Sequence, residues 1–163
     1  MKNDLSEIVL ALGSNIGNRE NNLADALNYI KNYLNEPIAM SKIYESLPVD
    51  FLNQPSFLNL VVAYQVQKNF NPLELLEITQ NIEGKIGRNK TIPKGPRKID
   101  IDILFINDLK YDDDRLTIPH PEIYNRDFVY YPLLEIKHCT TKIHLESKII
   151  PPENRLKNLK MCP

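Results

Sequence analysis

Residues 95–106 read GPRKIDIDILFI, and from Lys98 onward charged and apolar residues alternate along the stretch. A period of two predicts a β-strand with one buried face, because successive side chains of a strand point to opposite sides. The two aspartates of the stretch therefore share one face. We expect the buried face to carry Ile99, Ile101, Ile103 and Phe105, and the opposite face to carry Lys98, Asp100, Asp102 and Leu104.

Asp100 and Asp102 are separated by about 7 Å of backbone on this predicted strand. Aspartate is unfavourable in strands, so a pair within one strand needs a physical reason. One reason is a hard cation, because Mg²⁺ takes one or two carboxylates together with phosphate oxygens and water. The other is a solvated strand face, and the two aspartates alone leave both interpretations open.

The segment before the aspartates is strongly basic. Positions 85–98 contain no acidic residue, although the whole chain is nearly neutral, with 20 basic and 21 acidic residues. A basic loop that leads into paired carboxylates is typical of a polyphosphate site, in which Arg and Lys bind phosphate oxygens and the acids hold the metal. A solvated basic loop is the alternative. The basic residues are Lys85, Arg88, Lys90, Lys94, Arg97 and Lys98.

The remaining pattern predicts an α+β fold. Apolar runs favour strands at 8–12, 39–46 and 57–66, and helical spacing favours helices at 23–34 and 72–86. The order strand, helix, strand, strand, helix, strand is that of a ferredoxin-like βαββαβ core. We expect the first and last strands to be neighbours in the middle of an antiparallel sheet, with the helices over one face. A short helix is also expected at 153–159, and 128–136 is an apolar stretch interrupted by Pro132.

Composition narrows the function classes. The chain has 163 residues, and we expect a single domain over 1–163. Cys139 and Cys162 form no metal-binding spacing and imply neither a disulfide framework nor a catalytic thiol. No apolar run has the length of a signal peptide or a membrane span, so we expect a cytoplasmic protein without a membrane partner. The balanced charge disfavours a nucleic-acid partner.

Two further stretches carry weaker chemical hints. Phe57 and Asn59 fall on one face of their predicted strand, where a ring and an amide could hold a flat heterocycle. Taken alone, an ordinary strand with one tolerated polar residue explains the pair better. The turn GSNIGN at 13–18 is a tight strand-to-helix turn and no Walker loop, because no Gly-Lys-Ser/Thr follows it.

Five stretches together resemble one family closely. They are ALGSNIGNRENNL (11–23), QPSFLNLVV (54–62), LLEITQNIEGKIGR (75–88), GPRKIDIDIL (95–104) and RLTIPHPEIYNRDFVYYPLLEI (115–136). The chain resembles the 6-hydroxymethyl-7,8-dihydropterin pyrophosphokinases of folate biosynthesis. The resemblance implies an α+β fold with a ferredoxin-like core and pyrophosphokinase-type additions. It also implies transfer of pyrophosphate from ATP to the hydroxymethyl group of the pterin, with release of AMP.

The resemblance assigns catalytic roles to four residues. Asp100 and Asp102 would hold two Mg²⁺ ions that bridge the ATP phosphates. Arg88 and Arg97 would contact the phosphates and assist the transfer, a role that suits their forked donors. Phosphoryl-type transfer depends on positioning and electrostatics more than on covalent chemistry. The acceptor of the hydroxyl proton stays open between Asp102 and a metal-bound water.

The resemblance also implies two sets of substrate contacts. The residues implied to bind ATP are Gln80, Glu83, Arg88, Arg97, Ile103, Arg115, Thr117, His120 and Arg126. Phe57 and Phe128 would sandwich the pterin ring, and Asn59 would read its edge. The backbone around Ser46 and Val49 would supply further contacts to the ring.

The chain departs from the family pattern at two positions. Lys94 stands where many members carry Trp, and an ammonium–phosphate contact would replace stacking there. Pro121 stands where some members carry Tyr. Both departures are expected to alter ATP affinity more than the reaction itself. Members of the family also occur fused to other folate-pathway enzymes, and such fusion is an expected form of partnership.

Two rival functions have discriminating features. A nucleotidyltransferase of the polymerase-β type also pairs a Gly-Ser turn with two aspartates, but on adjacent elements. Here most of the chain separates Ser14 from Asp100, which argues against that class. A binding or regulatory module without turnover would have no use for two acids and two arginines in one pocket. Loss of turnover in a folded Asp100→Asn variant would exclude such a module.

Overall fold

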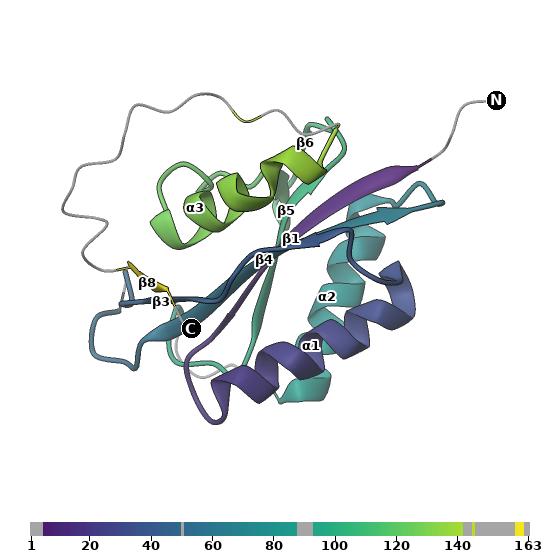
Figure 1. The fold of residues 1–163 in the computed structure, drawn as a ribbon. Coiled ribbons are helices and arrows are strands. Elements are labelled where there is room, and N and C mark those ends of the chain that lie inside the picture. Colours follow the sequence, from purple (N-terminus) through teal and green to yellow (C-terminus); the bar gives the residue numbers. More distant parts are fainter. Residues whose placement is uncertain (1–4, 50, 88–92, 142–144, 146–158, 162–163) are drawn as a thin grey trace.

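The computed structural model describes residues 5–49, 51–87, 93–141, 145 and 159–161, which form a central sheet with helices on both faces (Figure 1). Helices α1 (Arg19–Leu34) and α2 (Pro72–Ile86) cover one face, and α3 (Asp127–Ile136) covers the other. The strands of the sheet are β1 (Ser6–Ser14), β2 (Ala39–Met40), β3 (Tyr44–Ser46), β4 (Phe57–Val66), β5 (Asp100–Ile106) and β8 (Leu159–Met161). A separate hairpin joins β6 (Tyr111–Asp112) to β7 (Thr117–Ile118), and the 3-10 turn η1 (Lys137–Cys139) follows α3.

The sheet has the strand order β5-β1-β4-β3-β8, with β2 pairing beside β4, and every pairing in it is antiparallel. The α+β class with a ferredoxin-like core is confirmed, and β5 lies next to β1 as expected. The expected central position of β5 is wrong. Within the described residues β5 pairs only with β1, so it lies at one end of the order, and β1 and β4 occupy the middle.

A β-bulge changes the faces of β5 after its first half. Val9 pairs with Phe105 and Leu10 with Ile103, so Leu104 is the extra residue of the bulge. As a result Leu104 and Phe105 both pack under α3, and Ile106 returns to the side of α1 and α2. The predicted side of Phe105 is therefore wrong, because the bulge interrupts the alternation. Asp100 and Asp102 precede it and keep a common face.

Two apolar cores explain why the long strands are apolar on both faces. The larger core lies between the sheet and helices α1 and α2, and contains Ile8, Leu10 and Leu12 of β1. The smaller core lies under α3 and contains Val9 and Ala11 of the same strand. Burial on both sides gives a continuous apolar run in place of alternation. Strand β1 is consequently packed on both faces, which makes it a rigid support for the residues beside it.

The outer edge of β5 is covered by other parts of the chain. The carboxylate of Glu83, on α2, accepts a hydrogen bond of 2.8 Å from the backbone nitrogen of Ile101. The backbone nitrogen of His120 donates to the carbonyl oxygen of Leu104 over 3.1 Å. Edge positions of the strand that carries the aspartates thus have partners outside the sheet.

Local sequence explains both ends of α2. Asn71 caps α2 by accepting from the backbone nitrogen of Leu73 at 2.9 Å, Pro72 occupies the first turn, and Gly87 ends the helix with φ +104°.

The single strand predicted at 39–46 is two short strands, β2 and β3. Helix α3 was not predicted because Pro132 lies within it. The helix predicted at 153–159 lies outside the described residues except Leu159, which begins β8.

Candidate active site

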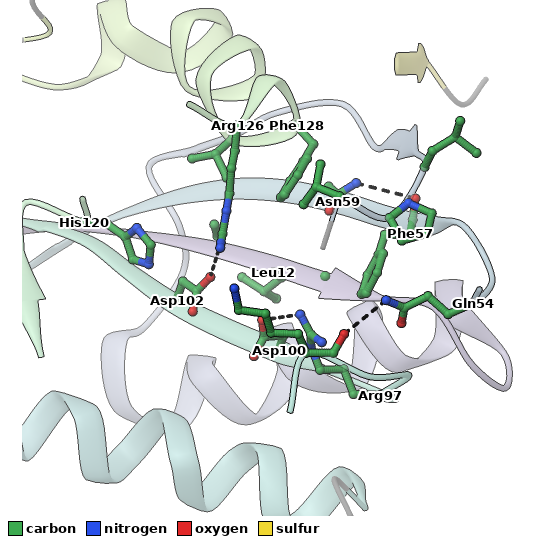
Figure 2. A pocket seen from close by; sticks show the side chains of 17 residues that line it. Leu12, Gln54, Phe57, Asn59, Arg97, Asp100, Asp102, His120, Arg126 and Phe128 are labelled. Carbon is green, nitrogen blue, oxygen red and sulfur yellow. Dashed lines mark hydrogen bonds and ion pairs between the residues drawn. The ribbon is translucent and has the colours of Figure 1, made fainter. Parts of the chain in front are cut away.

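A pocket of about 290 Å³ lies on the α3 side of the sheet (Figure 2). Its floor is formed by Ala11, Leu12 and Gly13 of β1. Its walls come from β4, β5, the start of α3 and the loop segments at 47–49, 51–56 and 93–97. Its polar side chains are Gln54, Asn59, Lys94, Arg97, Asp100, Asp102, His120 and Arg126, and its other lining residues include Leu47, Pro48, Val49, Phe57, Phe128 and Val129.

The paired carboxylates lie side by side at one end of this pocket. Arg97 forms an ion pair of 3.2 Å with Asp100, and Arg126 lies 3.9 Å from Asp102. Burial, together with the charge of Asp100, raises the pKa of Asp102 to about 7, although Arg126 and Arg97 act in the opposite direction. The two acids are therefore crowded, and a cation between them would favour the ionised form of both.

This donor set fits a magnesium ion that is shared with a polyphosphate. Among the described residues no group of three or more His, Cys, Asp or Glu side chains is placed to hold a metal ion. Mg²⁺ does not need such a group, because it is commonly held by one or two carboxylates and completes its shell with phosphate oxygens and water. Asp100 and Asp102 supply that number of carboxylates from one strand.

Arg97 connects the acidic end of the pocket to its aromatic end. Its Nη2 pairs with Asp100, its Nη1 donates to the carbonyl oxygen of Gly95 at 2.8 Å, and its guanidinium lies 5.0 Å from the ring centre of Phe57. The backbone nitrogen of Arg97 donates to Oδ1 of Asn15 at 2.8 Å, and its carbonyl oxygen accepts from the backbone of Asn15 at 3.2 Å. The turn at 13–18 thus holds the arginine in place.

Gln54 and Asn15 belong to the site although sequence reasoning missed them. Nε2 of Gln54 donates to the carbonyl oxygens of Phe51 at 2.7 Å and Lys94 at 3.1 Å. Its Oε1 accepts from Nδ2 of Asn15 at 2.9 Å. Loop residues of this kind leave no periodic signal, because their partners are set by the tertiary structure. Both lie inside motifs that carried the family resemblance, and that was the available signal.

His120 presents a hydrogen-bond donor to the pocket. Its Nδ1 accepts from the backbone nitrogen of Glu122 at 3.1 Å, so Nδ1 carries no proton in this arrangement. Burial lowers the pKa of His120, and the nearby charge of Arg126 lowers it as well. The ring is therefore neutral near pH 7, with its proton on Nε2. A neutral N–H donor is suited to a phosphate oxygen.

The aromatic end of the pocket combines two rings and an amide. Phe57 and Asn59 come from β4, and Phe128 comes from the first turn of α3 (Figure 2). Val49 completes this end from the loop segment at 47–49. A Cβ added to Gly13 would lie 3.5 Å from Oδ1 of Asn59 and 3.7 Å from the Phe57 ring. The absence of a side chain at Gly13 therefore leaves space in the pocket beside Asn59 and Phe57. The arrangement can hold a flat ring with a polar edge.

Several predicted ATP-binding residues lie outside the pocket lining. Gln80 is exposed on α2, Glu83 is bonded to the edge of β5, and Ile103 is 2% exposed in the larger core. Arg115 and Thr117 lie on the β6–β7 hairpin, where they contact Asp113 and Asp112. Arg88 lies outside the described residues, and Ser46 is bonded to Asn59 rather than lining the pocket. Their substrate contacts stay predictions.

Within the described residues no helix has the length and apolar character needed to cross a membrane.

Comparison with known proteins gives a consistent picture. Residues 9–138 match the family model described as 7,8-dihydro-6-hydroxymethylpterin-pyrophosphokinase. A Bacillus subtilis protein named 2-amino-4-hydroxy-6-hydroxymethyldihydropteridine pyrophosphokinase is 42% identical over 128 residues, which is 78% of this chain and 75% of that protein. An Arabidopsis thaliana folate synthesis bifunctional protein is 42% identical over 131 residues, or 80% of this chain and 27% of its own length.

Solved structures agree at the level of the fold. A crystal structure of Plasmodium falciparum HPPK-DHPS matches with a TM-score of 0.63 at 20% sequence identity. The match covers 82% of this chain and 40% of that one. The chain thus corresponds in fold to one part of that longer protein.

Proposed function

The chain belongs to the 7,8-dihydro-6-hydroxymethylpterin-pyrophosphokinase family, and from this premise we propose that the pocket in Figure 2 is its active site. The enzyme is an ATP-dependent diphosphotransferase of folate biosynthesis. It transfers pyrophosphate from ATP to the hydroxymethyl group of 6-hydroxymethyl-7,8-dihydropterin. Because the transferred group comes from the β- and γ-phosphates, AMP is the second product.

One observation carries the assignment of the site. Paired carboxylates and an aromatic slot lie in the same pocket, and Arg97 contacts both, through Asp100 at 3.2 Å and the Phe57 ring at 5.0 Å. A transfer between two substrates requires both to be bound with their reacting atoms close together. A pocket with a polyphosphate end and a heterocycle end, joined by one arginine, meets that requirement.

The aromatic end is the proposed pterin site. Phe57 and Phe128 would stack on the two faces of the ring, and Asn59 would bond to its edge. Val49, and the backbone near Ser46, would close the slot from the β3 side. In this pose the hydroxymethyl group points along the pocket toward Arg97.

The acidic end is the proposed phosphate site. Asp100 and Asp102 would hold two Mg²⁺ ions, which neutralise charge on the transferred group. Arg97 and Arg126 would bind phosphate oxygens with their forked donors, and His120 would donate from Nε2. Arg97 is already held by its hydrogen bond to the carbonyl oxygen of Gly95, and His120 by its bond from the backbone nitrogen of Glu122, so these two donors need little reorganisation during the transfer.

Further residues remain proposed contacts of ATP on the strength of the resemblance. Arg88 is proposed as a second catalytic arginine beside Arg97. The others are Gln80, Glu83, Ile103, Arg115 and Thr117. We also propose a single domain over 1–163 and a cytoplasmic location, where ATP is available. The bifunctional relatives favour the further proposal that proteins of this family act joined to other folate enzymes.

Product analysis tests this proposal directly. The protein is mixed with ATP, Mg²⁺ and 6-hydroxymethyl-7,8-dihydropterin, and nucleotides and pterins are separated by chromatography. We expect AMP and pterin pyrophosphate only when the pterin is present. Asp100→Asn should abolish turnover in a folded protein, whereas Asp108→Asn, outside the pocket, should not. Formation of ADP or of free pyrophosphate would contradict the assigned reaction.

A further inference from the structure

The amide nitrogen of Asn59 is engaged by the neighbouring strand β3. Nδ2 donates to Oγ of Ser46 at 2.8 Å and to the carbonyl oxygen of Tyr44 at 3.3 Å. A side-chain amide has only two N–H donors, so these two partners use both. A contact of 3.5 Å to the carbonyl oxygen of Phe57 is at the limit of hydrogen bonding.

The amide oxygen of Asn59 remains for the pocket. Within the described part of the chain no hydrogen bond to Oδ1 is found, and Asn59 lines the pocket. Gly13 lies beside this oxygen and has no side chain to cover it. The pocket therefore offers an acceptor, and no donor, at this point of its wall.

We propose that Ser46 is a positioning residue, whose hydroxyl fixes the Asn59 amide with its oxygen toward the pterin. The inference rests on the proposed function of the pocket. Oδ1 then accepts from an N–H of the ring, and a dihydropterin carries such donors on its amino group and on ring nitrogens. A ring edge that presents only acceptors is repelled, because its lone pairs would face the oxygen. Ser46 thereby sets which edge of the heterocycle binds to Asn59.

Ser46 is the side chain on which this orientation depends. The other partner of Nδ2 is the backbone carbonyl of Tyr44, which every residue at that position would supply. The Ser46 hydroxyl is also the closer partner, and the residue is 5% exposed, so water is poorly placed to replace it. Without the Ser46 hydroxyl, one N–H of the Asn59 amide has no hydrogen-bond partner. The amide then becomes more stable if it rotates and points that N–H into the pocket, where water or substrate can accept it.

The test compares Ser46→Ala, Ser46→Thr and Ser41→Ala with the unsubstituted protein. Ser41 is a matched control, because its hydroxyl is also buried and also bonded to β4, accepting from the backbone nitrogen of Val61 at 3.0 Å. Pterin binding is measured by fluorescence titration with a non-hydrolysable ATP analogue present, and KM is measured for both substrates. Melting temperature reports on the fold.

We expect Ser46→Ala to weaken pterin binding by about five- to tenfold, the worth of one buried hydrogen bond, with the KM for ATP unchanged. Ser46→Thr keeps the hydroxyl and should bind pterin like the unsubstituted protein. Ser41→Ala should bind pterin normally. If Ser46→Ala does not fold, Ser46→Cys retains the size with a weaker acceptor and should show a smaller loss in the same direction.

Two results would overturn the inference. One is an unchanged pterin affinity in folded Ser46→Ala; the other is an equal loss in Ser46→Ala and Ser41→Ala, which would indicate a general structural effect. Failure of the unsubstituted protein to bind the pterin at all would instead overturn the proposed function, and the inference with it.

Discussion

Nε2 of Gln54 lies 3.1 Å from the carbonyl oxygen of Lys94, and this hydrogen bond joins two loop segments that border the pocket, 51–56 and 93–97. The same amide group holds Phe51 within its own loop and accepts from Asn15 of the turn after β1. The loop beside the aromatic slot and the loop beside the carboxylates are thus linked through one side chain. We therefore expect binding at one end of the pocket to affect the order of the loop at the other end.

Gln54→Ala should weaken both substrates together. The variant removes three hydrogen bonds at the junction of the loops, and each is worth about 1 kcal/mol, so we expect a loss of about tenfold or more in kcat/KM for ATP and for pterin. Steady-state kinetics measures it. Gln65→Ala changes an exposed glutamine of β4 and serves as the control. A loss confined to one substrate would refute the coupling of the loops.

Lys94 is expected to contribute a positive charge to ATP binding. It lines the pocket with φ +60°, a conformation that strains most residues. Lys94→Ala and Lys94→Gly both remove the ammonium, but only glycine relieves the backbone. Equal losses of about three- to tenfold in ATP affinity, with pterin affinity retained, would identify the charge as the cause. Lys110→Ala, exposed and outside the pocket, should leave ATP affinity unchanged. Normal ATP binding by both Lys94 variants would exclude this role.

Gly13→Ala should narrow the pterin slot without unfolding the protein. The added Cβ would meet Asn59 and Phe57 at ordinary contact distances, so stability should change by less than about 1 kcal/mol. The methyl group would however occupy the floor on which the pterin ring is proposed to lie, and the KM for pterin should rise more than the KM for ATP. Gly84→Ala, which meets nothing within 4 Å, is the control. An unchanged KM for pterin would place the ring elsewhere.

The bond between Tyr44 and Glu135 predicts a loss of stability at high pH. Burial, with the hydrogen bond to Glu135 at 2.6 Å, raises the pKa of Tyr44 from 10.0 to about 12. The folded state therefore holds this proton more tightly than the unfolded chain. The stabilisation is complete below pH 10 and is lost as pH rises toward 12. Urea unfolding of the protein and of Tyr44→Phe should differ below pH 10, and the difference should shrink above it. A constant difference would contradict the assignment.

The periodicity of apolar residues predicted those strands and helices whose faces are buried in the core. The alternation at Asp100 and Asp102 placed both on one face, and helical spacing placed α2 at its observed residues, with a start at Asn71 and Pro72 that capping chemistry explains. The bulge at Leu104 could not be predicted, because it depends on the register with β1. The edge position of β5 likewise depends on which strands pair, a long-range choice that no window of sequence contains.

The residues of the site were less predictable from local pattern than the helices and strands were. Alternation alone hinted at the aspartates and at the Phe57–Asn59 pair, and only the family resemblance gave them roles. Phe128 and Arg126 were found in the same way, although α3 itself was not predicted. The network of Asn15 and Gln54 escaped because it joins residues far apart in the chain through loop conformations, for which a single sequence carries no periodic signal.

The position of β5 at the end of the sheet would ordinarily expose the chain to self-association. An edge strand with free N–H and C=O groups is a template on which a strand of another molecule can add. The carboxylate of Glu83 on Ile101 and the backbone of His120 on Leu104 occupy groups that an incoming strand would need. The strand that carries the two aspartates, Asp100–Ile106, is therefore also the strand whose edge α2 and the His120 segment protect, and loosening either of them should increase aggregation as well as lower activity.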